Sequence, residues 1–291
     1  MALYAFDGTW NEEKDAGEYG RNTNVVRFRN VYEGRQEFYT KGVGTRYGLI
    51  GKVLGGAFGV GGRHRIREAS AQMAKNFVTG DTDIDIVGFS RGAALALHFA
   101  NVIAREGVRD PATGAVIAKK PTIRFLGLWD LVAAFGIPIN LGIRFNRINL
   151  GYVLTLPDNV QHCFHALALD ECRQAFRPTR TKGGYEVWFR GVHSDVGGGN
   201  DNAKLNNIAL RWMLKKAVIV GLPVPADSIE TVTQNADPNA SIGHNFDAIK
   251  NASRTVKTGD RIHYTVSARQ GCVNPPDACP VESRADEGTR A

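Results

Sequence analysis

The sequence predicts an α/β fold in which a mainly parallel β-sheet is flanked by helices and interrupted by loop insertions. Short apolar runs that suit buried strands alternate with helical patterns along most of the 291 residues. Conspicuous polar residues follow directly after several of these runs, and open α/β sheets bind their ligands at such strand ends. We therefore expect the functional residues at the carboxyl edge of the sheet.

A single domain over residues 1–274 accounts for this pattern, because no internal repeat or sharp change of composition marks a boundary. The hydrophobic content of 43% is ordinary for a globular protein and predicts a sizeable core. Residues 275–291 are rich in proline and charge, so we expect them to form a disordered tail.

The N-terminal part begins with a short apolar strand at residues 3–6, which ends at the polar turn Asp7-Gly8-Thr9-Trp10-Asn11. Residues 12–24 are polar and predict a loop. The mixed pattern of residues 25–32 then suits a helix, and residues 37–41 suit a second strand.

A glycine-dense segment follows at residues 42–62, with nine glycines among bulky apolar side chains such as Leu49, Leu54 and Phe58. Neither phosphate-loop pattern, GxxxxGK[ST] or GxGxxG, fits this segment, so we expect no nucleotide site. Because so much glycine gives the backbone freedom, we interpret the segment as a mobile flap whose Leu49, Leu54 and Phe58 bind substrate. Tight turns over a core are the alternative.

The middle of the chain predicts a helix over residues 63–78, a buried strand at 84–87 and a helix of small residues over 93–100. Residues 109–114 have the composition of a loop. The apolar run TIRFLGL at residues 122–128 predicts the next strand.

The last third predicts an irregular insertion over residues 136–159, where proline, asparagine and glycine are frequent. A strand and a turn are expected within residues 160–176, and another strand at 185–189. Residues 205–220 form a clear amphipathic pattern and predict a helix.

The net charge of +7 makes the surface attractive to anionic partners. The lysines and arginines are scattered, and no module that reads DNA or RNA is present, so we expect no nucleic-acid partner. Anionic lipid head groups, or solubility alone, explain the charge better.

The N-terminus, MALYAFDGTWN, has neither a basic n-region nor a long apolar h-region, so we expect a chain made in the cytoplasm without a Sec signal. No run of 18 apolar residues predicts a membrane-spanning helix. The cysteines show no zinc spacing and are expected to be thiols in the cytoplasm, although Cys272 and Cys279 could pair in an oxidising space.

The stretch DIDIVGFSRGAALALHFAN, residues 83–101, places Ser90 between a strand and a helix in the pattern G-x-S-x-G. This is the pattern of a nucleophile elbow, a turn that strains the serine backbone and presents its hydroxyl. The helix N-terminus then directs N–H groups toward an oxyanion formed there. A serine in an ordinary turn is the alternative, but the small residues that follow suit an elbow helix packed on the sheet.

A serine nucleophile needs a base that takes its proton and a carboxylate that orients that base. In the α/β-hydrolase arrangement these follow the serine in the order Asp or Glu, then His, each after a later strand. Asp130 follows TIRFLGLW, and His193 comes at the end of YEVWFRGVH. We therefore predict Ser90, Asp130 and His193 as the catalytic residues.

Other residues compete for these two roles. His263, in the strand-like run RIHYTV, is the alternative base, but His193 precedes a glycine-rich loop that can leave its ring free. Asp170 and Asp195 are alternative acids. Asp195 is more plausibly a brace that accepts from backbone N–H groups of the histidine loop.

The remaining histidines do not predict chemistry. His98 is expected to pack on the elbow helix, and His64 and His244 to lie at the surface. His162 and His165 have no third ligand nearby in the sequence, so we expect no metal site and no cofactor.

An oxyanion hole in this arrangement takes one N–H from the residue after the nucleophile, which is Arg91 here. The second N–H comes from a loop after an earlier strand. The turn after the first strand supplies such a donor, and we predict Gly8 or Thr9 for this role.

Five motifs together resemble one family: FDGTWN, GFSRGA, GLWDLVAAFG, HALALDE and WFRGVHSDVGGG. The set is similar to the α/β-hydrolase family that contains the Tle-type phospholipase effectors of type VI secretion systems. The resemblance covers roughly residues 3–200, with a weaker echo in IHYTVSAR, and it implies a phospholipase or esterase with its triad on Ser90, Asp130 and His193. The usual basic run after HALALDE is altered here to Cys172-Arg173-Gln174, which does not change the predicted catalytic residues.

We therefore expect a serine hydrolase that cleaves lipid carboxylic esters through an acyl-enzyme, with phospholipid as substrate and peripheral contact with a membrane. The resemblance further implies export by a type VI secretion system and a partner in the secretion apparatus or an immunity protein. The chain is short beside the large effectors of this kind. An esterase or thioesterase for small soluble substrates, or a non-catalytic binding or delivery domain, are the alternatives.

Overall fold

The structure is a computed structural model that describes residues 1–8, 13–14, 21–34, 36–42, 54–133, 152–243, 252–269, 275 and 277–289, with backbone alone at residues 36 and 54–60. The strands of its main sheet are β1 Ala2–Phe6, β2 Gln36–Thr40, β3 Ile84–Phe89, β6 Ile123–Trp129, β7 Val160–Ala168, β8 Tyr185–Phe189, β9 Arg261–His263 and β10 Val281–Glu282. Strands β4 Val108–Arg109 and β5 Val116–Ala118 pair separately as an antiparallel hairpin.

The helices are α1 Asn24–Val31, α2 Leu54–Val78, α3 Arg91–Glu106, α4 His193–Gly197, α5 Ala203–Ile219 and α6 Ala226–Gln234. Three short 3₁₀ turns complete the described elements: η2 Gln174–Phe176, η3 Tyr264–Ala268 and η4 Asp286–Gly288. None of these described helices is both long and apolar enough to cross a lipid bilayer.

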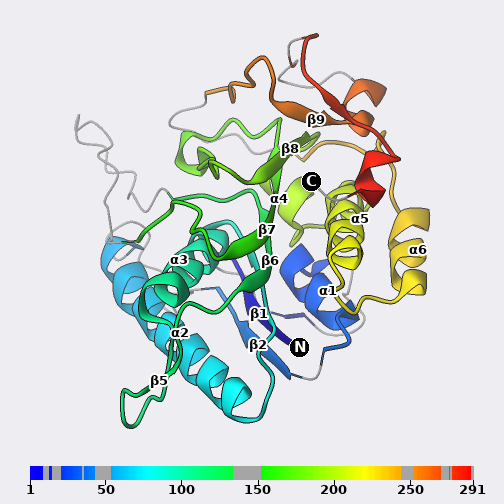
Figure 1. Ribbon diagram of the computed structural model, residues 1–291. Coiled ribbons are helices and arrows are strands. Elements are labelled where there is room, and N and C mark those ends of the chain that lie inside the picture. The colour runs from blue at the N-terminus through cyan, green and yellow to red at the C-terminus, as the bar shows by residue number, and fades with distance from the viewer. Residues whose placement is uncertain are drawn as a thin grey trace, which may run out of the picture.

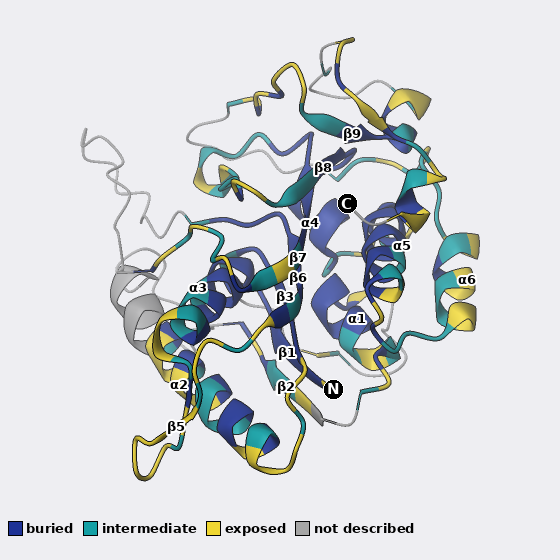
Figure 2. Cartoon of the chain, in the orientation of Figure 1, coloured by how far each residue is buried: buried dark blue, intermediate teal, exposed yellow. Residues whose placement is uncertain are grey.

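The eight main strands lie in the order β10-β9-β8-β7-β6-β3-β1-β2, and every neighbouring pair is parallel. Helices α2 and α3 cover one face of this sheet, whereas α1, α5 and α6 lie on the other (Figure 1). The α/β fold with a parallel sheet is therefore confirmed. Burial follows these layers, since the central strands are buried and α6 is largely exposed on its outer side (Figure 2).

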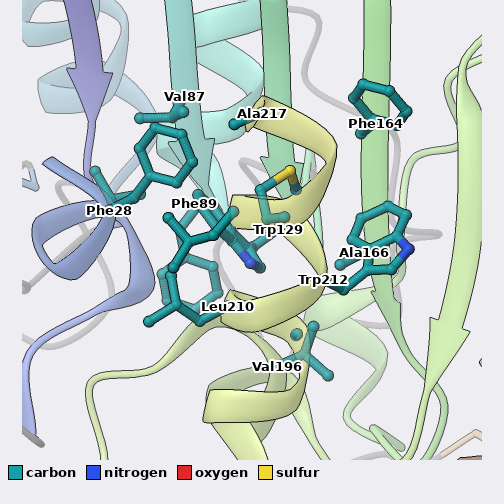
Figure 3. Packing of buried hydrophobic residues seen from close by; sticks show 14 of the residues in the cluster. Phe28, Val87, Phe89, Trp129, Phe164, Ala166, Val196, Leu210, Trp212 and Ala217 are labelled. Atoms are coloured by element: carbon teal, nitrogen blue, oxygen red, sulfur yellow. The ribbon is translucent and has the colours of Figure 1, made fainter. Parts of the chain in front are cut away.

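Alternation along β1 shows why the sheet is buried on both faces. Tyr4 and Phe6 pack with α2 and α3, whereas Leu3 and Ala5 belong to the core under α1 and α5. Figure 3 shows the second core, where Phe28 of α1 and Trp212 of α5 meet aromatic residues of the central strands. Parallel strands covered on both sides explain why the apolar runs in the sequence are nearly continuous.

Part of the glycine-dense segment at residues 42–62 has a different secondary structure from the one predicted. Residues 54–62 are helical: they form the first turns of α2, which begins at Leu54. Close approach explains one of the glycines, because a Cβ at Gly62 would lie 2.0 Å from the Tyr152 hydroxyl and 3.0 Å from Leu95. Residues 43–53, which include Leu49, lie outside the described part of the chain.

The predicted strands and helices between residues 3 and 40 and between 63 and 220 are present in order. Most boundaries are shifted by a few residues, whereas α2 begins at Leu54 and not at residue 63. The predicted loop at 109–114 is the turn of the hairpin formed by β4 and β5. Most of the predicted insertion, residues 134–151, lies outside the described residues.

The C-terminal residues correct a second prediction, because residues 277–289 are not disordered. Strand β10 extends the sheet beside β9, and η4 packs on α5. Glu282 and Glu287 are fully buried, and Glu282 Oε1 lies 2.9 Å from the buried Lys216 ammonium of α5. The charges that suggest a solvated tail are thus partners for cations of the body of the protein.

Glu287 is the centre of this contact. Its carboxylate accepts from Arg211 at 2.5 Å, from Lys215 at 2.9 Å and from His263 at 2.8 Å. Burial alone would raise the pKa of Glu287, but the His263 hydrogen bond and the Arg211 charge lower it to about 2.

We expect Glu287→Gln to destabilise the protein on the order of 3 kcal/mol at pH 7, because it leaves buried cations without their carboxylate. Urea unfolding followed by circular dichroism measures the change. Glu230→Gln on the exposed side of α6 is the matched control and should stay within about 0.5 kcal/mol of wild type. Equal stabilities for the two variants would show that the Glu287 carboxylate does not stabilise the fold.

Candidate active site

The strand order creates a switch point between β1 and β3. From β1 the chain passes to β2 on one side and then crosses to β3 on the other. Phe6 pairs with Gly88 in the sheet, so Asp7 and Ser90 emerge side by side at the carboxyl ends of these strands. Open α/β sheets bind ligands in the crevice at this position.

The G-x-S-x-G turn shows the geometry of a nucleophile elbow. Ser90 has φ 58° and ψ −126°, a left-handed conformation that L-residues rarely adopt, and it lies between β3 and α3. A Cβ at Gly92 would lie 2.3 Å from the Phe6 carbonyl oxygen, and one at Gly88 would lie 2.7 Å from Ala93 Cα. Both glycines are therefore required by close backbone approach.

The structure brings the three predicted catalytic residues together. Ser90 Oγ lies 2.8 Å from His193 Nε2, and His193 Nδ1 lies 2.5 Å from Asp130 Oδ2. Ser90 and His193 are only 4% and 5% exposed, and Asp130 is completely buried. The order of contacts, hydroxyl to imidazole to carboxylate, is that of a serine hydrolase triad.

Asp130 stands at the end of β6 with φ 41°, and its surroundings stabilise the ionised carboxylate. Oδ1 accepts from the Ala168 N–H at 2.9 Å, and both carboxylate oxygens accept from Arg254. Burial would raise the pKa of Asp130, but the Arg254 charge and the His193 hydrogen bond hold it well below its usual range. The carboxylate therefore stays negative near neutral pH.

The His193 ring is held between two aromatic side chains at the start of α4. Its centroid lies 4.6 Å from that of Phe89 and 4.8 Å from that of Phe176. Burial lowers the pKa of His193, and the bond to Asp130 opposes this shift. The neutral imidazole, which is the form that can accept a proton, is thus favoured near neutral pH.

The two alternative acids do not contact His193 through their carboxylates. Asp170 pairs with Arg190 at 3.0 Å and accepts from the Gly191 N–H, which fixes the end of β8. Asp195 accepts from the backbone N–H groups of Val192 and Gly243. The predicted role of Asp195 as a brace of the histidine loop agrees with these bonds.

The competing histidine, His263, lies in a different set of contacts. It is fully buried, its ring stacks on Phe189, and its nitrogens face Thr265 and Glu287. His165 accepts from the Leu131 N–H at 3.1 Å, directly after Asp130, and so supports the backbone of that carboxylate. Neither the His263 ring nor the His165 ring is hydrogen-bonded to Ser90 among these contacts.

The predicted oxyanion donors have different surroundings. Arg91 is the first residue of α3, whose N-terminus directs partial positive charge toward the serine. The Gly8 N–H donates to the Asp7 carboxylate at 2.7 Å, so this bond must open or be shared before Gly8 can bind an oxyanion. Thr9 lies outside the described residues.

The side chains predicted to bind substrate, those of Leu49, Leu54 and Phe58, are not described by the structure. Leu49 falls outside the described residues, and Leu54 and Phe58 belong to α2, of which only the backbone is described there. Among the described residues, no cluster of three or more His, Cys, Asp or Glu side chains could hold a metal ion.

The sequence did not predict two residues that contact Asp130 and His193. Arg254, on Asp130, lies in a segment without any recognisable motif, so no pattern pointed to it. Glu171, which accepts from the His193 N–H at 3.1 Å, stands in the quoted motif HALALDE, and its position there was the available clue.

The sequence model of the type VI secretion system Tle1-like phospholipase effector catalytic domain matches residues 3–117 and 109–216 of this chain. The chain belongs to this family. The match spans the elbow, Asp130 and His193, whereas Arg254 and the last two strands of the sheet lie beyond it. No curated protein matches the chain.

Solved structures resemble this Tle1-like domain at low identity. A crystal structure of an uncharacterized protein from Pseudomonas aeruginosa has a TM-score of 0.53 and 21% identity, over 80% of this chain and 48% of that one. The structure of the Tle1 effector bound to the VgrG spike has a TM-score of 0.48 and 24% identity, over 68% of this chain and 51% of that one. The chain thus spans about half the length of each, and the first likeness shows the shared fold.

Asp7, in the FDGTWN motif, is a buried carboxylate beside the turn at Ser90. Its oxygens accept from the hydroxyls of Thr23 and Tyr39, both at 2.9 Å, and from the Gly8 N–H. Burial raises the pKa of Asp7 to about 6, although these hydrogen bonds oppose the shift.

Asp7→Asn should therefore change how stability depends on pH. A carboxyl with a raised folded-state pKa holds its proton more tightly when folded, so its stabilising effect is lost as pH rises from about 4 through about 6. Relative to wild type, the variant should gain up to about 3 kcal/mol between pH 4 and pH 7. Urea unfolding at both pH values measures this gain.

The control is Asp201→Asn, at a carboxylate whose side chain is 78% exposed, and its stability curve should run parallel to that of wild type. If the Asp7→Asn curve is also parallel, Asp7 does not titrate in this range and the argument from its burial is wrong.

Proposed function

We propose that this protein is a serine hydrolase that cleaves carboxylic esters of lipids, with phospholipids as its substrate class. The observation that carries the proposal is the contact of Ser90 Oγ with His193 Nε2 at 2.8 Å, with the opposite ring nitrogen on Asp130. Membership of the Tle1-like phospholipase effector family supports the choice of lipid esters over other acyl compounds.

In the proposed mechanism, His193 Nε2 takes the proton of Ser90 as Oγ attacks the ester carbonyl carbon. The negative oxygen of the tetrahedral intermediate is stabilised by the N–H of Arg91 at the start of α3 and by the turn after β1. Collapse of the intermediate breaks the ester bond, and the leaving alcohol receives the proton from His193. Water then attacks the acyl-enzyme by the same route and releases the acid.

Asp130 stays ionised through both steps. It orients His193 so that Nδ1 carries the proton and Nε2 faces the serine, and it stabilises the imidazolium that forms. The aromatic rings of Phe89 and Phe176 limit rotation of the imidazole about this axis.

Export by a type VI secretion system and binding to its apparatus belong to the same proposal. They rest on the family, and the related Tle1 effector has been solved on the VgrG spike. A lipid substrate also requires peripheral contact with a membrane, for which the net charge of +7 suits anionic head groups.

Ser90→Ala should abolish ester turnover, a loss on the order of 10⁴ to 10⁶ in rate, because only the nucleophile is removed. The fold should remain, since backbone contacts set the elbow. Hydrolysis of phospholipid vesicles and of short- and long-chain nitrophenyl esters measures the loss, and a fluorophosphonate probe should label Ser90 in the wild type.

Ser228→Ala on α6 is the control and should keep wild-type turnover and labelling. Ser90→Ala activity within tenfold of wild type would reject Ser90 as the nucleophile. Activity on short soluble esters without any on vesicles would favour the esterase alternative, and no activity on any ester would favour a binding or delivery domain.

His193→Ala should reduce turnover as severely as Ser90→Ala, and the double variant should be no worse, because the two residues act as one unit. Asp130→Asn should fall between them and wild type, since it favours the wrong imidazole tautomer. His263→Ala should lower thermal stability while turnover per folded molecule remains. The assignment of the base is wrong if His263→Ala abolishes turnover and His193→Ala does not.

A further inference from the structure

The Asp130 carboxylate is paired with a buried arginine, Arg254. Arg254 Nη1 donates to Oδ1 at 2.6 Å and Nη2 donates to Oδ2 at 2.9 Å, so the guanidinium grips both oxygens. His193 shares Oδ2 with Arg254. The side chain of Arg254 is only 3% exposed, so solvent screens this ion pair little.

Two further bonds fix the guanidinium itself. Nη1 donates to the Ala168 carbonyl and Nη2 to the Phe176 carbonyl, both at 2.6 Å. Ala168 ends β7, and Phe176 belongs to η2 and contacts the His193 ring. Arg254 therefore holds the carboxylate, the adjacent strand end and one wall of the histidine site in a single arrangement.

We propose that Arg254 is a positioning residue of the hydrolytic centre, which keeps Asp130 ionised and aligned on His193 and extends the working range of His193 toward lower pH. This inference rests on the proposed hydrolase function. It goes beyond the triad because a fourth residue, which is cationic, then controls the lower pH limit of turnover.

Electrostatics gives the direction of this control. Asp130 and His193 share a proton and titrate as a pair, so their apparent pKa belongs to both. A fixed positive charge on the carboxylate makes protonation of the pair less favourable, whichever partner carries the proton. Arg254 lowers the pKa of His193 in the same sense as burial does, whereas Asp130 raises it.

The other charges that face His193 do not replace Arg254. Glu171 accepts from the His193 backbone N–H and raises the pKa of the ring, but Arg173 binds both of its carboxylate oxygens. Asp195, on the same helix, is bonded to backbone N–H groups. Ser90 contributes a neutral hydroxyl, and the Phe89 and Phe176 rings carry no charge.

The test compares Arg254→Gln and Arg254→Lys with wild type in the full chain. In Arg254→Gln, the acidic limb of kcat/KM on a short-chain nitrophenyl ester should move up by about one pH unit, and the plateau should fall about 10- to 100-fold. Arg254→Lys keeps the positive charge but lacks the planar guanidinium that donates to both carboxylate oxygens. The acidic limb of its kcat/KM profile should therefore stay within about 0.3 pH units of wild type while the plateau falls.

A spectroscopic readout needs no substrate. In ¹⁵N-histidine NMR spectra, the titration midpoint of His193 should rise by about one unit in Arg254→Gln and stay near the wild-type value in Arg254→Lys. If Arg254→Gln does not fold, Arg254→Lys serves as the test. A wild-type plateau of kcat/KM in Arg254→Lys would overturn the positioning role. A lowered plateau with an unchanged acidic limb would support it.

Arg124→Gln is the matched control, because Arg124 also grips a buried aspartate, Asp85, with two bonds. Asp85 lies near the start of β3, at the opposite edge of the sheet from Ser90. This variant should lose stability without a change in the pH profile or the His193 midpoint.

The proposal is overturned if Arg254→Gln keeps the wild-type acid limb and midpoint, or if Arg124→Gln shifts both equally. These results differ from a failure of the proposed function, in which the wild-type protein itself shows no ester turnover that depends on Ser90.

Discussion

The contact between the end of β1 and the start of α3 is the constraint on which the candidate site depends. Gly92 lies so close to the Phe6 and Asp7 carbonyls that no side chain fits between them. This approach forces the chain to reverse at Ser90, which takes up the strained φ of 58°. The Ser90 N–H bonds to the Trp129 carbonyl at 3.0 Å, so the same turn is tied to the strand that ends at Asp130.

A second set of contacts ties the histidine to this turn. Thr23 donates to Asp7 through its hydroxyl, accepts from Val26 as the N-cap of α1, and pairs with Gly198 just after α4. Asn24 donates to the Val196 carbonyl within α4. The start of α1 therefore joins the turn beside Ser90 to the helix that begins at His193. Rigid backbone links of this kind hold a serine and a histidine from distant parts of the sequence at hydrogen-bond distance.

The sequence predicted the residues whose roles depend on local pattern and missed those whose roles depend on tertiary contacts. Ser90, Asp130 and His193 each follow an apolar strand, so the parallel sheet brings them to one edge once the strands are recognised. Arg254 and Glu287 have no such mark, because an arginine in a loop or a glutamate near the chain end looks solvated until its partner is placed. Gly62 misled for the same reason, since its close approach to Tyr152 and Leu95, which explains a glycine at this position, is a tertiary contact.

Buried contacts extend the candidate site beyond the part of the chain that the family model matches. That match ends at residue 216. Two partners of the site lie after it: Arg254, which donates to Asp130, and Gly243, whose N–H donates to Asp195. A completely buried carboxylate costs several kcal/mol unless a cation compensates it, so Asp130 cannot be separated from the segment that carries Arg254. The same reasoning joins Lys216 of α5 to Glu282 of β10. Arg254 and Gly243 are thus part of the surroundings of the site, and the charge at Asp130 that orients His193 depends on Arg254.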